Sequence, residues 1–103
     1  MARTPEGKVK DQVVKLLKEF DVYYFFPNTH GYGRSGVPDI VGCLPDGRFL
    51  AIECKAEGKE PTALQQRELD RIIDRMGLAL VITPENIDLL KFLLKEFKNA
   101  ERG

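Results

Sequence analysis

The sequence predicts an α/β domain in which helices flank a mixed four-stranded sheet, in the order helix, three strands, helix, strand, helix. Three segments, 6–20, 63–76 and 83–97, carry apolar residues at the spacing of an amphipathic helix. A hairpin is expected between two apolar segments that flank a Pro-Asp-Gly turn. The apolar run 78–82 follows a helix, which favours a buried strand set parallel to the strand before that helix. With 103 residues, the chain fits a single domain, 1–103.

The first helix should begin near Thr4, which suits the N-cap position, with Pro5 as its first residue. Its inward face is formed by Val9, Val13, Leu16, Leu17 and Phe20. Glu6 falls on that face in the first turn. Two interpretations of Glu6 remain open: an acid favoured by the helix dipole, or a residue of a functional site. Residues 22–26 are then expected to form a strand that Pro27 ends.

The hairpin sets up the arrangement on which any functional prediction depends. Pro45 and Gly47 suit a type I turn followed by a positive φ, and this turn fixes the pairing of the two strands. The register sets Asp39 opposite Glu53, with Cβ atoms roughly 4.5–5.5 Å apart. Lys55 lies two residues beyond Glu53 and so joins the same face.

Two carboxylates this close repel one another unless a cation lies between them. A hard divalent ion such as Mg²⁺, bound through oxygen ligands, would resolve the repulsion between Asp39 and Glu53. The alternative is a surface cluster of ion pairs with Lys55, and the pattern alone leaves both interpretations open.

The second helix is expected over residues 63–76, with Thr62 as its cap and Gly77 at its end. Gln65 should lie near the sheet end that carries Lys55. The inward face is expected to comprise Leu69, Ile72, Ile73 and Met76. The basic residues Arg67, Arg71 and Arg75 are interpreted as a solvated stripe paired with Glu68, Asp70 and Asp74. Thr83 and Pro84 should open the last helix.

Composition narrows the function classes only partly. Sixteen basic and sixteen acidic residues balance, which neither supports nor excludes a nucleic-acid partner. No phosphate-binding Gly-x-x-x-x-Gly-Lys motif supports nucleotide hydrolysis. Cys43 and Cys54 are expected to be unpaired core residues. The absence of a long apolar run and of a signal-peptide pattern predicts no membrane association and an intracellular location, the host cytoplasm if the protein is viral.

The segment Gly36-Val37-Pro38-Asp39, followed by Glu53-Cys54-Lys55, resembles the PD-(D/E)XK nuclease superfamily. Glu6 in the first helix and Gln65 at the start of the second make the set similar to the VRR-NUC family, the virus-type replication-repair nucleases. The resemblance extends over nearly the whole chain. It implies a restriction-endonuclease-like core.

The resemblance also implies an endonuclease dependent on Mg²⁺ or Mn²⁺. Asp39, Glu53 and the backbone carbonyl of Cys54 would hold the ion, Lys55 would position water or stabilise charge, and Gln65 would orient Lys55, water or phosphate. Glu6 would complete an outer shell around the ion. The following candidates for DNA contacts lie in the preceding loop: Tyr32, Arg34 and Ser35.

Branched DNA, such as flaps or the four-way Holliday junctions of DNA repair, is the expected substrate. A single small domain suggests a homodimer, which would present two sites to a symmetric junction. Two alternatives remain: an archaeal-type junction resolvase or restriction-like nuclease, and a non-catalytic DNA-binding or assembly subunit with the same fold.

Overall fold

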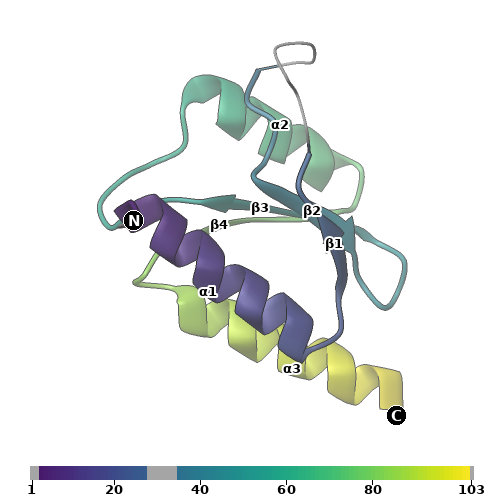
Figure 1. The fold of residues 1–103 in the computed structure, drawn as a ribbon. Coiled ribbons are helices and arrows are strands. Elements are labelled where there is room, and N and C mark those ends of the chain that lie inside the picture. Colours follow the sequence, from purple (N-terminus) through teal and green to yellow (C-terminus); the bar gives the residue numbers. More distant parts are fainter. Residues whose placement is uncertain (1–2, 28–34, 103) are drawn as a thin grey trace.

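The computed structural model describes residues 3–27 and 35–102 and confirms the predicted fold class (Figure 1). The elements are α1 (Pro5–Glu19), β1 (Tyr23–Phe25), β2 (Ile40–Cys43), β3 (Phe49–Cys54), α2 (Ala63–Asp74), β4 (Leu78–Ile82) and α3 (Ile87–Arg102). No helix in this part of the chain is long and apolar enough to cross a membrane.

The four strands form one sheet in the order β1-β2-β3-β4. The first two pairings are antiparallel and the third, β3 with β4, is parallel, as predicted. The predicted hairpin register is also confirmed, because Val41 lies opposite Ala51. The turn closes through the Gly47 N–H, which donates to the Leu44 carbonyl, and Gly47 has a φ of 91°. The ladder begins at Ile40, so Asp39 lies one residue outside it.

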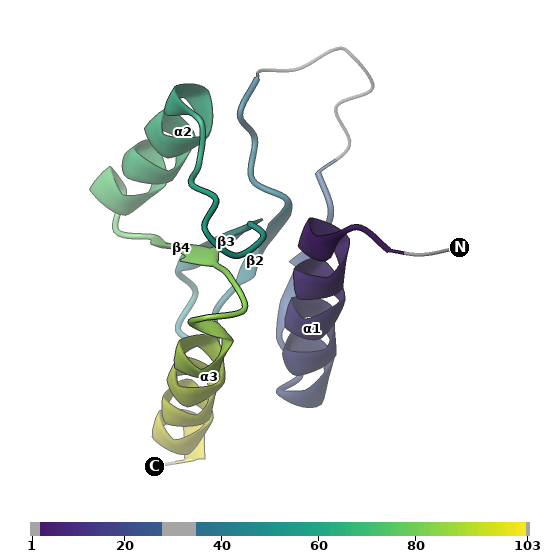
Figure 2. The same ribbon diagram turned by 90° about the vertical axis from the view of Figure 1, so that its left-hand side faces the viewer.

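Helices cover both faces of the sheet (Figure 2). Helices α1 and α3 lie on one face and enclose the larger core, whose fully buried residues include Val13, Leu17, Leu50, Ile52 and Ile82. Helix α2 lies on the other face over a smaller cluster of Val41, Ala51 and Leu69. Alternate residues of β2 and β3 therefore point either into the main core or toward α2.

The end of α2 differs from the expected one. The helix ends at Asp74, and Met76 adopts a left-handed φ of 71°. The N–H groups of Met76 and Gly77 then donate to the carbonyls of Ile73 and Ile72, which is the Schellman arrangement. Met76, 76% exposed, was therefore wrongly predicted to face inward, and so was Ile73 of the last helical turn, which is 50% exposed. Helical spacing cannot show where a left-handed residue turns the chain away.

Two further expectations were wrong. Cys43 is exposed rather than buried, because it lies on the α2 side of the hairpin; Cys54 is buried, and both cysteines are free. The last helix begins at Ile87 instead of Thr83. The side chain of Asn86 accepts from the Thr83 N–H at 2.7 Å and donates to the Val81 carbonyl at 2.8 Å. These bonds hold residues 83–86 in a turn.

Candidate metal centre

Glu53, near the end of β3, is the most unusual residue of the sheet. It is 1% exposed and faces α2, in the same row as Ala51. Its Oε1 accepts a hydrogen bond from Gln65 Nε2 at 3.4 Å. Its Oε2 is buried and has no hydrogen-bond partner among residues 3–27 and 35–102. A buried oxygen left in this state is destabilising, so the position is suited to a ligand atom.

Asp39 is held beside Glu53 by the backbone. Its Oδ2 accepts a hydrogen bond from the Cys54 N–H at 2.9 Å, which links the start of β2 to the end of β3. Upstream, Gly36 packs directly against the first turn of α2. A Cβ on Gly36 would lie 2.5 Å from the Leu64 carbonyl oxygen, so only glycine fits there.

Glu6 completes the cluster from a third element. It lies in the first turn of α1, where Thr4 caps the helix as predicted by accepting from the Gly7 N–H at 3.0 Å. Carboxylate oxygens of Glu6, Asp39 and Glu53 lie within 4.8 Å of one another. Such an all-oxygen donor set suits a hard divalent cation.

The electrostatics of the cluster agree with this donor chemistry. Burial and then the neighbouring Asp39 carboxylate raise the pKa of Glu53 from its ordinary 4.5 to about 8, and Lys55 opposes the shift. At neutral pH, Glu53 therefore retains its proton when no cation is bound. Binding of a cation would displace that proton.

Lys55 lies beside the acids. Its N–H donates to the Ile82 carbonyl of β4 at 2.9 Å, which fixes the backbone. Its Nζ is 3.8 Å from Glu6 Oε1, and the side chain is only 13% exposed. It borders a cleft of about 460 Å³ whose other walls include Pro5, Glu6 and Lys59. The cleft gives the ammonium group access to solvent.

Gln65 serves two partners. Its Oε1 accepts from the Thr62 N–H at 2.9 Å, while the Thr62 hydroxyl accepts from the Gln65 N–H, so the pair forms a capping box. Its Nε2 donates to Glu53. The sequence suggested Lys55, water or phosphate as the partner of this amide; in the structure, the partner is Glu53.

Cys54 is not suited to nucleophilic chemistry. Burial, followed by the charges of Asp39 and Glu53, raises the pKa of its thiol to about 12, so the group stays protonated. Metal ligation by its backbone carbonyl remains a prediction.

The loop candidates for DNA contacts are only partly described. Tyr32 and Arg34 lie outside the described residues, and Ser35 is exposed. The arginines of α2 were expected to pair with their acidic neighbours. The ion pairs found in the described ranges do not include them, and Asp70 instead accepts from Gln66 at 2.9 Å. Arg71 and Arg75 line a groove that was not predicted from the sequence.

We expect Gly36→Ala to destabilise the fold by roughly 2–4 kcal/mol, because it adds a clash to an unfavourable positive φ. Gly58→Ala is the matched control. Gly58 has a φ of 77° but open space around it, so the loss there should be about 1 kcal/mol. Urea denaturation of the three proteins measures both losses. Equal losses would contradict the close contact between Gly36 and α2.

Comparisons with known proteins show which proteins this chain resembles in sequence and in fold. No model of a protein family matches this chain. Over 55 residues, 53% of the chain, it is 50% identical to "Putative nuclease p44" of Acyrthosiphon pisum secondary endosymbiont phage 1, and the match spans 59% of that protein's length. A solved structure described as a VRR_NUC domain superposes with a TM-score of 0.71 and 26% identity, over 85% of this chain and 95% of that one.

Proposed function

From the premise that this chain has the VRR-NUC fold, as its sequence predicted, we propose that it is a metal-dependent endonuclease that hydrolyses phosphodiester bonds in DNA. The fold is a restriction-endonuclease-like core, and both the structural neighbour and the phage relative carry nuclease names. Fold alone does not fix an activity, so the proposal depends on the site.

The observation that carries the proposal is the buried, unpartnered Oε2 of Glu53 inside a cluster of three carboxylates. A purely structural carboxylate would have its oxygens satisfied by protein donors. Here, Oε2 has no such donor, and the Glu53 carboxylate lies within 4.8 Å of carboxylate oxygens of Glu6 and Asp39. That arrangement favours a cation ligand over a structural ion pair.

In this mechanism, Asp39 and Glu53 would hold Mg²⁺ or Mn²⁺, with the Cys54 carbonyl as a further ligand. The bound ion would polarise the scissile phosphate and lower the pKa of its water. Lys55 places its ammonium group beside the cluster, where it stabilises charge that develops on the phosphoryl oxygens or positions the attacking water.

The two remaining residues act through these groups. Gln65 holds the Glu53 carboxylate in place through its Nε2. Glu6, half-exposed at 50%, pairs with Lys55 and would lie in an outer shell around the ion.

Branched DNA is the proposed substrate, and the protein is proposed to act as a homodimer on it. Exposed Leu89 and Phe92 on α3 are candidates for an apolar interface between copies. Multi-angle light scattering should give twice the 11.7 kDa mass of a single chain. A strictly monomeric species at working concentration would contradict the dimer.

Incubation with forked, four-way and linear duplex DNA tests the proposal, each with Mg²⁺, Mn²⁺ or a chelator. We expect cutting with either ion, none with the chelator, and faster cutting of the branched forms. Binding of DNA without cutting under all conditions would favour the alternative, a non-catalytic subunit with this fold. Cutting restricted to four-way DNA would favour a resolvase of the archaeal type.

A further inference from the structure

A groove lies on the α2 side of the sheet, where the helix leaves β1 and part of β2 uncovered. Its volume is about 440 Å³, within the range of roughly 300–1,000 Å³ that is usual for ligand sites. Pro38, Val41 and Phe49 form its apolar floor, and Ile72 belongs to the facing wall on α2.

The rim of this groove is basic. Arg71 and Arg75 line it from one face of α2, four residues apart, and both are exposed. Glu68, also in the wall, is 7% exposed and therefore lies deeper than the arginines. A molecule entering from solvent meets the two guanidinium groups first, so the groove favours an anionic ligand with an apolar part.

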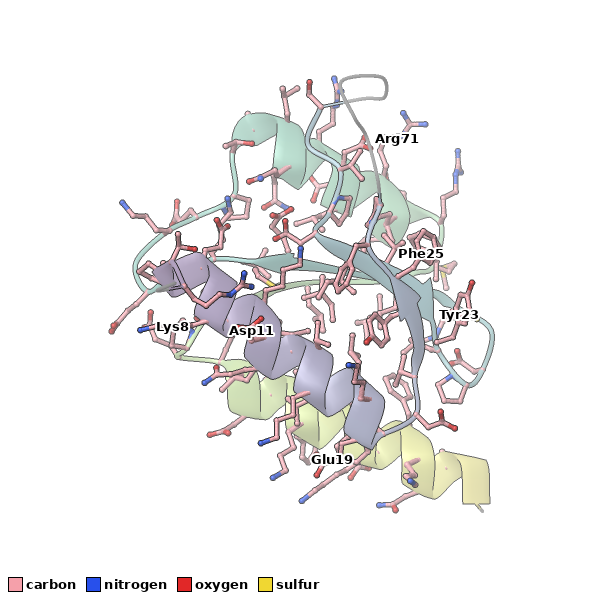
Figure 3. The ribbon with its side chains drawn as sticks, in the orientation of Figure 1. Lys8, Asp11, Glu19, Tyr23, Phe25 and Arg71 are labelled. Carbon is pink, nitrogen blue, oxygen red and sulfur yellow. The ribbon has the colours of Figure 1, made fainter. Side chains whose placement is uncertain are left out.

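Exposed aromatic rings continue the apolar floor onto β1. In the sheet register, Tyr23 lies opposite Cys43, which lies opposite Phe49, and Phe25 lies opposite Val41. Tyr23, Phe25 and Phe49 are 68%, 50% and 48% exposed. Figure 3 shows Tyr23 and Phe25 projecting from β1 below α2, from which Arg71 extends. Three aromatic residues exposed on one sheet face, beside two arginines, form a platform rather than a core.

The groove also adjoins the candidate metal centre. Val37 and Pro38 line it, and the next residue is Asp39. A strand lying in the groove would therefore run toward the carboxylate cluster.

We propose that this groove binds unpaired nucleotides of a nucleic-acid strand, with phosphates on Arg71 and Arg75 and bases stacked on Phe25, Phe49 and Tyr23. Basic grooves combined with aromatic platforms are the usual means of holding single strands. Paired bases in a duplex do not offer their faces for stacking. The inference rests on the proposed nuclease function, since it identifies the groove as the seat of an unpaired arm next to the cleavage site.

Fluorescence anisotropy with labelled oligothymidylate, in chelator, tests binding without any cutting. Phe25→Ala and Phe49→Ala should each weaken binding by about tenfold. The double variant Arg71→Ala/Arg75→Ala should reduce the slope of log K against log salt by about 1.4, or about 0.7 for each phosphate contact.

Matched controls lie on the other face of the sheet. Phe26→Ala removes an exposed ring that contacts Lys10 of α1, and Lys18→Ala/Lys95→Ala removes two exposed cations from α1 and α3. Neither control should change affinity or slope as the groove variants do. Equal effects in groove and control variants would overturn the proposal. Equal loss of single-stranded and duplex binding in the phenylalanine variants would overturn it as well.

Cleavage provides a second readout. With Mg²⁺, the groove variants should cut a duplex that bears a single-stranded arm at least tenfold more slowly, with little change on a nicked duplex. If the wild-type protein cuts neither DNA, the nuclease proposal fails, but the anisotropy comparison still decides the groove. Unchanged cutting of the arm-bearing DNA by every groove variant would contradict a role in the reaction.

Discussion

Lys55→Ala should reduce the rate of DNA cleavage by about 10²–10³-fold, the usual effect of removing one group that stabilises transition-state charge. Lys55 Nζ lies 3.8 Å from Glu6 Oε1, beside the acid cluster. Lys59 also lines the cleft but is more exposed than Lys55. Single-turnover rates on branched DNA with saturating Mn²⁺ measure the loss.

The fold and metal binding should survive this substitution, because the backbone N–H of residue 55 still reaches Ile82. Circular dichroism and calorimetric titration with Mn²⁺ check both. Lys59→Ala is the matched control, from the connector that borders the same cleft, and should change the rate by less than tenfold. Full activity in the Lys55 variant would rule out the proposed mechanism.

The stability of the metal-free protein should fall as pH rises from 5 to 8. Glu53 has a pKa of about 8 in the fold and an ordinary value of 4.5 when unfolded. Between these values, the folded protein binds one more proton than the unfolded chain, so the free energy of unfolding decreases with pH. The decrease from this group is roughly 3 kcal/mol across that interval. Thermal denaturation in chelator at several pH values measures it.

Glu53→Gln should remove most of this pH dependence, because the amide carries no titrating proton. Mg²⁺ or Mn²⁺ should stabilise the wild-type protein strongly at pH 8 and little at pH 5, where the ion competes with protons. The glutamine variant should gain little from either ion at any pH. A wild-type stability that rises between pH 5 and 8 in chelator would contradict the protonated state of Glu53.

The parts of the fold that local chemistry specifies were predictable from the sequence. Pro45 and Gly47 determine the turn, and the turn determines the register of β2 and β3. Thr4 and Thr62 begin their helices as expected, because a cap depends on residues three or four apart. The parallel position of β4 followed from the handedness of strand-helix-strand connections.

The parts that depend on contacts between distant segments were not predictable. No pattern showed that Asp39 would accept from the Cys54 N–H, or that Gln65 would bind Glu53. The exposure of Cys43 depends on how far α2 extends over the sheet. The groove on that side was missed for the same reason. Its signal was present, however, as arginines at four-residue spacing on α2 and as the unbroken run of aromatic residues in β1.

The single amide of Gln65 joins the first turn of α2 to the buried acid of β3, with both of its polar atoms already in use. Loading the centre with an ion would thus tighten the start of the helix, and fraying there would release the carboxylate, since such coupling is reciprocal. Hydrogen exchange of the backbone amides in the first turn of α2 would then report, at a distance, whether the metal centre holds an ion.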